Sequence, residues 1–373
     1  MPKEFTVTPW KVEGEVDYTK LIKEFGVQEV NEKLLERIKK HTGELHYMLR
    51  RKIFFSHIDL GFILDEYEKG NKFYLYTGRG PSGNTHLGHL VPWMFTKWLQ
   101  DKFDAELWFQ MTDDEKFIFN PELELEETNR LAYENALDVI ALGFKRGKTF
   151  IFSDVDYGKT LYKQAIRVAK RLTVSTTKAA FGLTDSDSVG KHFFTTVQSV
   201  PAFLPSVLKG KNIPCLIPCA IDQSVHFRLT RDIVHKLGYY KPAGLYNVFL
   251  PALTGPKGKM SASIAETAVY TTDAPEVVEK KIRKYAFSGG RDTVEEHRKH
   301  GGNPDIDVSY QWLRFFEEDD KKLERIHDEY KSGKLLSGEL KEILIEKLTV
   351  FLKKHQENRE RARKVLDSYI LKD

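Results

Sequence analysis

Two short segments of this 373-residue chain carry side chains suited to binding phosphate and neutralising its charge. The first, GRGPSGNTHLGH at residues 78–89, directly follows the apolar run at 73–76. The second, KGKMSAS at residues 257–263, combines lysines with serine hydroxyl groups. The first has the order of a strand, a glycine-rich turn and a helix start, and the second is typical of a flexible cationic loop. Together they predict a site that holds ATP and neutralises its phosphates during attack on the α-phosphate.

The chemistry of the first segment follows from its turn and from three polar side chains. Glycines let the backbone turn tightly and approach a nucleotide closely, and the helix that follows presents free amides to phosphate. His86 and His89, three residues apart, are expected on one face of the first helical turn. Arg79 adds a permanent cation beside them. Taken singly, either histidine is better explained as structural, and only the second segment reverses that balance.

The second segment supplies mobile positive charge and hydroxyl donors. Lys257 and Lys259 bring the charge, and Ser261 and Ser263 donate hydrogen bonds to phosphate oxygens. Such donors accelerate a reaction when they meet charge that develops only in the transition state. The alternative interpretation is an exposed basic loop without a ligand.

Short apolar runs predict the sheet that must position both segments. They lie at residues 73–76, 107–111, 150–152, 215–219 and 248–250. Runs this short and without alternation are typical of parallel strands buried on both faces. Between them Ala132, Ala136, Val139 and Ile140 trace one helix face, with Gly143 as its stop. The alternation predicts an α/β fold with a Rossmann-like, doubly wound parallel sheet.

Composition along the chain predicts three parts. Residues 1–71 form a charged N-terminal extension with a helix at 29–40, and residues 72–263 form the sheet domain, with a mostly helical insertion at about 117–211. Residues 264–373 are expected to form an α-helical C-terminal domain, in which Leu340, Ile343, Leu344, Lys347, Leu348 and Phe351 trace one helix stripe. Residues 321–373 contain 14 lysines and arginines against 10 acidic residues. That excess suits contact with RNA phosphates, although on charge alone a solvated helix face explains it better.

Bulk composition excludes several classes of protein. The hydrophobic fraction of 41% and the net charge of +4 are ordinary for a globular chain. Cys215 and Cys219 are too few for a disulfide framework and are predicted to be small core residues. We find no apolar stretch of membrane-spanning length and no apolar region typical of a signal peptide. We therefore expect a protein of a reducing, soluble compartment.

The two opening segments resemble the HIGH and KMSKS signatures of class I aminoacyl-tRNA synthetases, with Ala262 in place of the usual second lysine. Further segments make the resemblance more specific, and the chain is similar to the tryptophanyl-tRNA synthetases of archaeal and eukaryotic type. It rests on YLYTGRGPS at 74–82, QMTDDEK at 110–116, TDSD at 184–187, CAIDQ at 219–223, KMSAS at 259–263 and AFSGGRD at 286–292. Residues 1–71 carry little of it.

The resemblance implies activation of L-tryptophan with ATP to tryptophanyl-adenylate, then transfer to the 3′ terminal ribose of tRNA(Trp). It assigns ATP binding to Arg79, Gly80, His86, Gly88, His89, Lys259, Met260, Ser261 and Ser263, of which the charged, imidazole and hydroxyl side chains are catalytic. It assigns tryptophan binding to Tyr76, Gln110, Glu115, Gln198 and Gln223, and anticodon contact to Arg291, Asp292 and Lys341. Lys116 and Asp222 receive no role. ATP implies Mg²⁺ on its phosphates, with no protein metal site and no tightly bound cofactor. The resemblance also implies a cytoplasmic homodimer.

Three other functions fit part of the pattern. A tyrosyl-tRNA synthetase shares the fold and both signatures, but its pocket needs a carboxylate partner for the phenol, which we cannot locate. A relative that binds RNA without catalysis is expected to have lost a signature residue, and Arg79, His86, His89, Lys259 and Glu115 are all present. A small-molecule nucleotidyltransferase has no need of the long helical C-terminal part.

Overall fold

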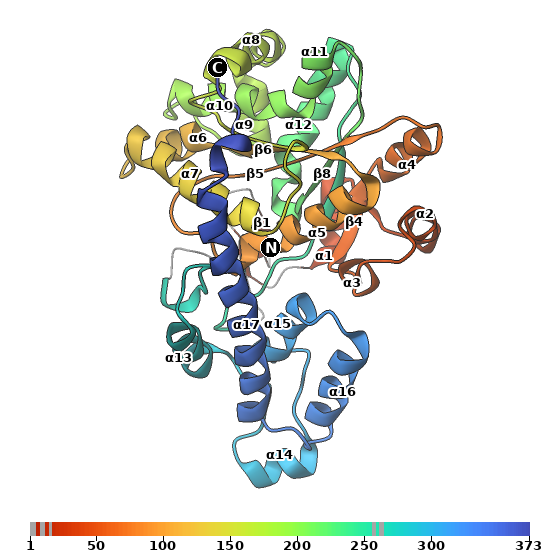
Figure 1. Ribbon diagram of the computed structural model, residues 1–373, viewed down its shortest axis with the longest axis vertical. Helices are drawn as coiled ribbons and strands as arrows, with labels where there is room; N and C mark the ends of the chain where they lie inside the picture. The colour runs from red at the N-terminus through yellow and green to blue at the C-terminus, as the bar shows by residue number, and fades with distance from the viewer. Residues whose placement is uncertain (1–4, 8–11, 15–16, 256–258, 261–264) are drawn as a thin grey trace.

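A computed structural model describes residues 5–7, 12–14, 17–255, 259–260 and 265–373. Its centre is a seven-stranded sheet with the order β3-β4-β9-β8-β5-β6-β7 (Figure 1). The strands are β3 (Gln28–Glu29), β4 (Phe54–Ile58), β5 (Tyr74–Arg79), β6 (Glu106–Met111), β7 (Thr149–Ser153), β8 (Cys215–Ala220) and β9 (Ala243–Asn247). The five strands from β9 to β7 are parallel, β4 pairs with β9 in antiparallel orientation, and β3 pairs antiparallel with β4. The predicted α/β class and parallel sheet are confirmed.

Four of the five predicted strands are confirmed, and the prediction of a strand at residues 248–250 is wrong. The strand there is β9, whose sequence AGLYN breaks its apolar character with Gly244 and Asn247. The backbone N–H of Val248 donates to the carbonyl of Ile53, and that of Phe249 donates to the Tyr18 hydroxyl. Residues 248–250 therefore leave the ladder as soon as β9 ends.

Residues 1–71 contribute to the sheet as well as packing on it. An antiparallel pair of short strands, β1 (Phe5–Val7) and β2 (Val12–Gly14), precedes the helices α1 (Tyr18–Phe25), α2 (Glu32–Thr42), α3 (Tyr47–Arg50) and α4 (Leu60–Glu68). The helix expected at 29–40 is α2, which begins later because Asn31 caps it by accepting from the Leu34 N–H at 3.0 Å. Glu29 belongs to β3 instead.

Helices between the strands cover both faces of the sheet. They are α5 (Leu87–Phe103), α6 (Asp113–Phe119), α7 (Leu125–Ala141), α8 (Gly158–Ala169), α9 (Val174–Phe181), α10 (Val189–Ser199), α11 (Leu204–Lys209) and α12 (Ser224–Val234), with 3₁₀ turns at Val200–Ala202, Ile221–Gln223 and His235–Leu237. β7 lies within residues 117–211, so part of the expected insertion is a strand of the sheet itself.

Alternate residues of the central strands belong to two separate hydrophobic cores. Leu75, Leu107 and Phe109 face one core, while Tyr76 and Trp108 face the other. This alternation is the pattern of a sheet covered on both faces. Cys215 and Cys219 are buried and unpaired, as expected.

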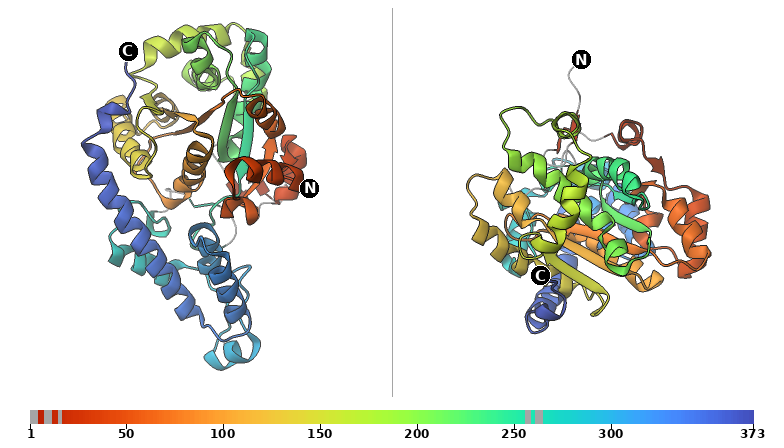
Figure 2. Two further views of the ribbon diagram at one scale, coloured as in Figure 1. Left: turned by 45° about the vertical axis from the view of Figure 1, so that its right-hand side comes forward. Right: turned by 90° about the horizontal axis from the view of Figure 1, so that it is seen from above.

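The residues after 264 are helical and extend away from the sheet (Figure 2). They form α13 (Pro275–Tyr285), α14 (Val294–His300), α15 (Val308–Phe316), α16 (Asp320–Lys331) and α17 (Ser337–Arg363), with 3₁₀ turns at Ala265–Thr267 and Leu366–Ser368. The predicted stripe lies on α17, and its Leu340, Leu344 and Leu348 are fully buried. α17 runs back to the sheet domain and packs along α7 (Figure 1). Beyond it, Leu371 donates to the carbonyl of Ile151 at 2.7 Å, which places the chain end beside β7.

Candidate active site

The main cavity lies where the strand order of the sheet reverses. From β5 the chain builds β6 and β7 on one side, then returns to add β8 and β9 on the other. β5 pairs with β6 along its whole length but with β8 only at Tyr74 and Leu75. Beyond Leu75 the two strands part and leave a cavity of about 360 Å³ at their carboxyl ends. Open α/β sheets bind ligands at this position.

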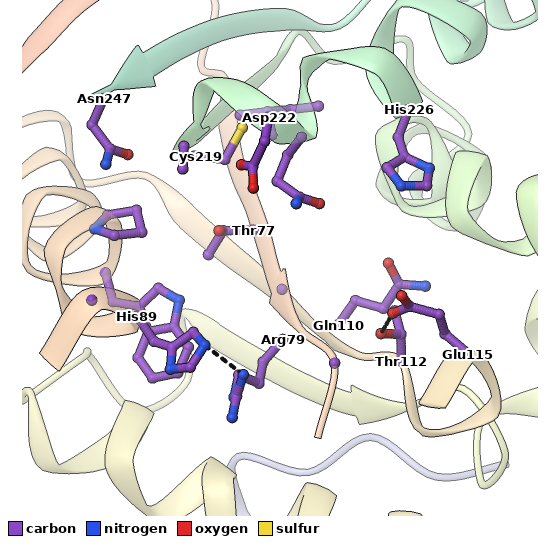
Figure 3. A pocket seen from close by; sticks show the side chains of 18 of the residues that line it. Thr77, Arg79, His89, Gln110, Thr112, Glu115, Cys219, Asp222, His226 and Asn247 are labelled. Atoms are coloured by element: carbon purple, nitrogen blue, oxygen red, sulfur yellow. Dashed lines mark hydrogen bonds between the residues drawn. The ribbon is translucent and has the colours of Figure 1, made fainter. Parts of the chain in front are cut away.

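The structure brings most of the predicted residues together in this cavity. Its walls include Tyr76, Arg79, Gly80, His86, Gly88, His89, Gln110, Glu115, Gln198, Gln223, Lys259 and Met260. Figure 3 shows the Arg79–His89 pair on one side of the cavity and Gln110, Thr112 and Glu115 on the other. The predicted Ser261 and Ser263 lie outside the described residues.

Two side chains, His89 and Asn135, hold Arg79 at the end of β5. Its Nη1 lies 2.7 Å from Nε2 of His89, and its Nε donates to Oδ1 of Asn135 on α7 at 2.9 Å. Nδ2 of Asn135 donates to the Gly83 carbonyl at 3.1 Å, so one amide fixes both the arginine and the glycine-rich turn. Burial lowers the pKa of Arg79 to about 10, although Asp138 and Glu115 oppose that shift. The guanidinium therefore stays charged at neutral pH.

The two histidines stack at the start of α5 as neutral rings. His86 precedes the helix, His89 lies in its first turn, and their ring centroids are 3.6 Å apart. Burial and the positive charges of Arg79 and Lys259 lower the pKa of His86 to about 3. Burial and the same charges hold the pKa of His89 well below its usual value. The histidines can thus act only as hydrogen-bonding groups, while Arg79 and Lys259 supply the positive charge.

Lys259 reaches the cavity from the second motif and pairs with Asp222. Its Nζ lies 2.6 Å from Oδ2 of Asp222, a residue that is 3% exposed in the 3₁₀ turn after β8. The same ammonium lies 5.5 Å from the centre of the Phe249 ring. The backbone N–H of the neighbouring Met260 donates to the Leu250 carbonyl at 2.9 Å. The lysine is therefore held at the wall of the cavity by the segment that follows β9 and by the turn after β8.

The opposite end of the cavity contains a line of polar groups among buried aromatic side chains. The Tyr76 hydroxyl donates to Oε1 of Gln110 at 2.5 Å and accepts from Nε2 of Gln198 at 3.0 Å. Tyr76 and Gln110 are almost completely buried, and burial raises the pKa of Tyr76 well above its usual value. Tyr76 is therefore a neutral hydroxyl, and Gln110 offers an amide oxygen to any donor that enters this end.

Glu115 supplies the negative charge of the site. Its carboxylate accepts from the Thr112 hydroxyl at 2.7 Å and pairs with Nζ of Lys116 at 2.8 Å. Burial would raise the pKa of Glu115, but Lys116 and Thr112 outweigh it and the pKa lies below its usual value. A Cβ at Gly80 would lie 2.0 Å from Cε of Lys116 and 2.9 Å from Oε2 of Glu115, so both side chains would have to move to admit one. A glycine in the turn thus allows a lysine and a carboxylate to approach the cavity.

The three predicted anticodon residues lie outside this cavity, in the helical part of the chain. Arg291 is exposed and donates through Nε to the Gly301 carbonyl at 3.0 Å, and Asp292 is exposed beside it. Lys341, on the second turn of α17, donates to the Arg283 carbonyl at 3.0 Å. Arg291 and Asp292, both described, form no ion pair with each other.

Asn135, Asp154 and Asp222 belong to this site, yet sequence reasoning assigned them no role. Asp154 accepts from Nε2 of Gln110 at 2.9 and 2.8 Å through its two carboxylate oxygens. Two signals were available in the sequence. Asp154 lies two residues after the strand run at 150–152, and Asn135 is polar on the predicted buried stripe of α7.

Two classes of feature are absent from the part of the chain that the structure describes. No three His, Cys, Asp or Glu side chains are grouped so that they could hold a metal ion. Among the same residues, no helix combines the length and the apolar character needed to cross a bilayer.

Comparison with known proteins identifies the family. A profile described as tRNA synthetases class I (W and Y) matches residues 68–353. The chain belongs to this class I tRNA synthetase family. It is similar to the tryptophan–tRNA ligase of Saccharolobus solfataricus, with 54% identity over 98% of this chain and 95% of the relative. It is also similar to the cytoplasmic tryptophan–tRNA ligase of Saccharomyces cerevisiae, with 50% identity over 99% and 89% of the two chains.

Solved structures of the class I tRNA synthetase family agree with this assignment. Tryptophanyl-tRNA synthetase of Plasmodium falciparum matches with a TM-score of 0.89 and 44% identity, over 95% of this chain and 97% of the other. A tryptophan-bound tryptophanyl-tRNA synthetase from Encephalitozoon cuniculi matches with a TM-score of 0.88 and 36% identity, over 95% and 98%. The predicted resemblance to the archaeal and eukaryotic tryptophanyl-tRNA synthetases is confirmed.

Proposed function

We propose that this protein activates L-tryptophan with ATP and transfers the tryptophanyl group to the 3′ terminal ribose of tRNA(Trp). One observation carries the proposal. A single cavity joins an aromatic end, with the Gln110 oxygen as acceptor, to an end where Arg79, His86, His89 and Lys259 meet. The relatives named as tryptophan–tRNA ligases span nearly the whole chain and support the choice of amino acid.

The aromatic end suits an indole ring. An indole N–H is a donor, and the Gln110 oxygen is an acceptor that burial keeps away from water. A site with a buried acceptor rejects an isostere that lacks the donor, because the acceptor is then left unpaired. The α-ammonium group needs acceptors, which Glu115 and Gln223 offer at the cavity wall. Gln198 already uses its amide nitrogen on Tyr76, so its amide oxygen is the atom that remains for the ammonium group.

The phosphate end suits attack of the tryptophan carboxylate on the ATP α-phosphorus. A carboxylate oxygen forms a bond to phosphorus while the bond to the bridging oxygen breaks and pyrophosphate leaves. Arg79 and Lys259 neutralise charge on the phosphates, and the neutral His86 donates a hydrogen bond to them, while His89 accepts from Arg79 and so orients its guanidinium. Ser261 and Ser263 are assigned the same task, and Mg²⁺ arrives with ATP. Positioning and charge stabilisation dominate such phosphate chemistry.

The deciding experiment is ATP–pyrophosphate exchange with tryptophan, with tyrosine and without an amino acid. Exchange with tryptophan alone is the expected result. Exchange with tyrosine would keep the reaction but overturn the assignment of the aromatic end. No exchange from folded protein supplied with Mg²⁺ would overturn catalysis altogether and favour a protein that only binds RNA.

We assign anticodon recognition to residues 264–373, with Arg291, Asp292 and Lys341 as contacts. The loop before Arg291 is rigid, because buried Asp307 accepts from the Gly289 N–H at 2.8 Å and from the Tyr330 hydroxyl at 2.7 Å. Exposed donors and acceptors on a fixed loop suit the edges of splayed RNA bases.

This recognition predicts a separation of the two half-reactions. Arg291→Ala lowers the rate of tRNA charging while pyrophosphate exchange without tRNA stays unchanged. Lys299→Ala, which removes an exposed charge from neighbouring α14, is the matched control. Equal loss of exchange and charging in the Arg291 variant would point to a folding defect instead.

A homodimer is proposed on the apolar surface of α8 and α10. Tyr162 is 58% exposed and Ile166 46%, and the ring of Phe193 on α10, 36% exposed, lies 6.3 Å from that of Tyr162. Large apolar side chains gathered on one face are typical of an interface. Sedimentation equilibrium should give twice the mass of the chain, and Ile166→Asp should shift it toward the monomer. A wild-type monomer would refute the dimer. We place the protein in the cytoplasm, following the yeast relative described as cytoplasmic, and imaging of a fluorescent fusion tests this.

A further inference from the structure

The buried amide of Gln110 is held on both sides. Its oxygen accepts from the Tyr76 hydroxyl, and its nitrogen lies 2.9 and 2.8 Å from the two carboxylate oxygens of Asp154. Asp154 follows β7 and is 5% exposed. Its backbone N–H donates to the carbonyl of Met111 at the end of β6, at 3.0 Å. The carboxyl group is therefore fixed beside Gln110 by its own backbone.

These contacts form a chain of hydrogen bonds that run in one direction. Gln198 donates its amide N–H to the Tyr76 oxygen at 3.0 Å, so the Tyr76 hydrogen is free to point at the Gln110 oxygen. Gln110 in turn donates its NH₂ group to Asp154. An amide can rotate by half a turn and exchange its oxygen and nitrogen, and only its partners decide which end faces where. At Gln110, the acceptor at one end is Asp154.

We propose that Asp154 is a positioning residue that sets the specificity of this enzyme for a substrate with a ring N–H. By accepting from the NH₂ of Gln110, Asp154 turns the amide oxygen toward the aromatic end of the cavity. That oxygen then accepts from the indole N–H. The reversed amide would present NH₂ to a donor and reject the indole. This inference rests on the proposed function and names a residue that acts through Gln110 without touching the substrate.

Asp114 is the acidic side chain that contacts Asp154, and it leaves Asp154 able to accept a hydrogen bond from Gln110. Burial and the charge of Asp114 raise the pKa of Asp154 well above its usual range, while burial raises the pKa of Asp114 to about 7. The two carboxyl groups are hydrogen-bonded to each other, so a proton on Asp154 is directed toward Asp114 and away from Gln110. The oxygens of Asp154 that face Gln110 still accept. Asp113, the third carboxylate here, is occupied by Ser153, Asn129 and the Val155 N–H.

The test compares tryptophan with β-(3-benzothienyl)alanine, in which sulfur replaces the indole N–H. The readout is the ratio of their kcat/KM values in pyrophosphate exchange. Asp154→Asn keeps the size of the side chain but adds an NH₂ group that can donate to the Gln110 oxygen and reverse the amide. We expect this ratio to fall at least about tenfold in the variant, because recognition of a buried N–H supplies most of the discrimination. The loss should fall on tryptophan, while kcat/KM for the analogue and the KM for ATP stay near their wild-type values.

Asp156→Asn is the matched control, because Asp156 lies two residues away and contacts Tyr133 and Asn129, not Gln110. It should leave the ratio unchanged. In a Gln110→Ala background, Asp154→Asn should have no further effect on the ratio, since the two residues act as one unit. If Asp154→Asn does not fold, Asp154→Ser gives the same comparison, because a hydroxyl can also donate to the amide oxygen.

Two outcomes would overturn the inference while leaving the proposed function intact. One is equal loss of both substrates in the Asp154 variant, which would show a structural role alone. The other is a wild-type enzyme that uses tryptophan but does not discriminate against the analogue. Absence of tryptophan-dependent exchange in the wild type would instead refute the proposed function itself.

Discussion

Asn135 provides the sharpest prediction about the phosphate end of the site. The side chain is 2% exposed, accepts from Nε of Arg79 and donates to the Gly83 carbonyl. Asn135→Ala removes both hydrogen bonds and leaves Nε of a buried guanidinium without its partner. A hydrogen bond to a charged group contributes about 1.5–3 kcal/mol and a neutral one about 1 kcal/mol. The guanidinium and the glycine-rich turn should therefore lose their fixed position relative to α5.

The expected effect is on the use of ATP. If the loss of about 2–4 kcal/mol divides between stability and catalysis, kcat/KM for ATP falls roughly 10- to 100-fold, since about 1.4 kcal/mol corresponds to a factor of ten. The KM for tryptophan should change little, because Asn135 contacts none of Tyr76, Gln110 and Gln198. The assay is pyrophosphate exchange with ATP varied at saturating tryptophan, then tryptophan varied at saturating ATP.

Asn129→Ala is the control for damage to α7. Asn129 lies on the same helix and bonds to Asp113, Ser153 and Asp156, none of which contacts Arg79. This variant should keep the wild-type kcat/KM for ATP. The reasoning fails if Asn135→Ala leaves that constant unchanged, or if both variants lower it equally.

Three further predictions concern charge and burial elsewhere. Lys259→Ala should lower the kcat of pyrophosphate exchange about 100-fold or more, as loss of a transition-state donor does. Tryptophan binding, measured by calorimetry, should stay unchanged. An unchanged kcat would show that Lys259 has no part in the mechanism. His355→Ala breaks the 3.0 Å contact with Asp138, in which both side chains are almost fully buried. The free energy of unfolding, measured by urea titration, should fall by about 3 kcal/mol. A loss near zero would show that the pair does not stabilise the fold. Burial, and then Arg50 and Arg51, lower the pKa of His46 to about 4. The unfolded chain therefore takes up this proton near pH 6.5 and the folded chain does not, so stability falls between about pH 6.5 and 4. His46→Asn should flatten that dependence in urea titrations at pH 7 and 5, and an unchanged slope would contradict the assignment.

Features that depend on local sequence were predictable. A buried parallel strand is a short apolar run, so β5, β6, β7 and β8 could be located from residue types alone. The glycine-rich turn and the start of α5 follow from backbone freedom and helix capping, which are also local. β9 was missed because Gly244 interrupts its apolar run, and only pairing with β4 and β8 makes it a strand. The place of β4 between β3 and β9, antiparallel to both, is likewise set by contacts far away in the sequence.

The same difference between local and distant determinants explains which residues of the site could be predicted. Residues at strand ends or in motifs, such as Gln110 and Lys259, could be selected because their own segments mark them. Asn135, Asp154 and Asp222 act by holding another functional side chain, and that partner is 44 residues away for Asp154 and 37 for Asp222. No pattern within a segment specifies such a pair. A polar residue on a buried stripe or after a buried strand gives the position, but only the fold gives its partner.

α17 links the neighbourhood of the cavity mechanically to the loop that carries Arg291. The helix contains 27 residues and is therefore a rod about 40 Å long. Near one end, His355 and Arg359 bind Asp138 on α7. Asp138 lies one helical turn from Asn135, whose amide binds Arg79. The other end of α17 packs against the loop that carries Arg291, where the Ser288 and Ser337 hydroxyl groups are 2.8 Å apart. A rod fixed near one end converts a tilt of a few degrees there into a shift of a few ångströms at the other. How precisely the surface around Arg291 is placed relative to the cavity therefore depends on how firmly His355 and Arg359 hold Asp138.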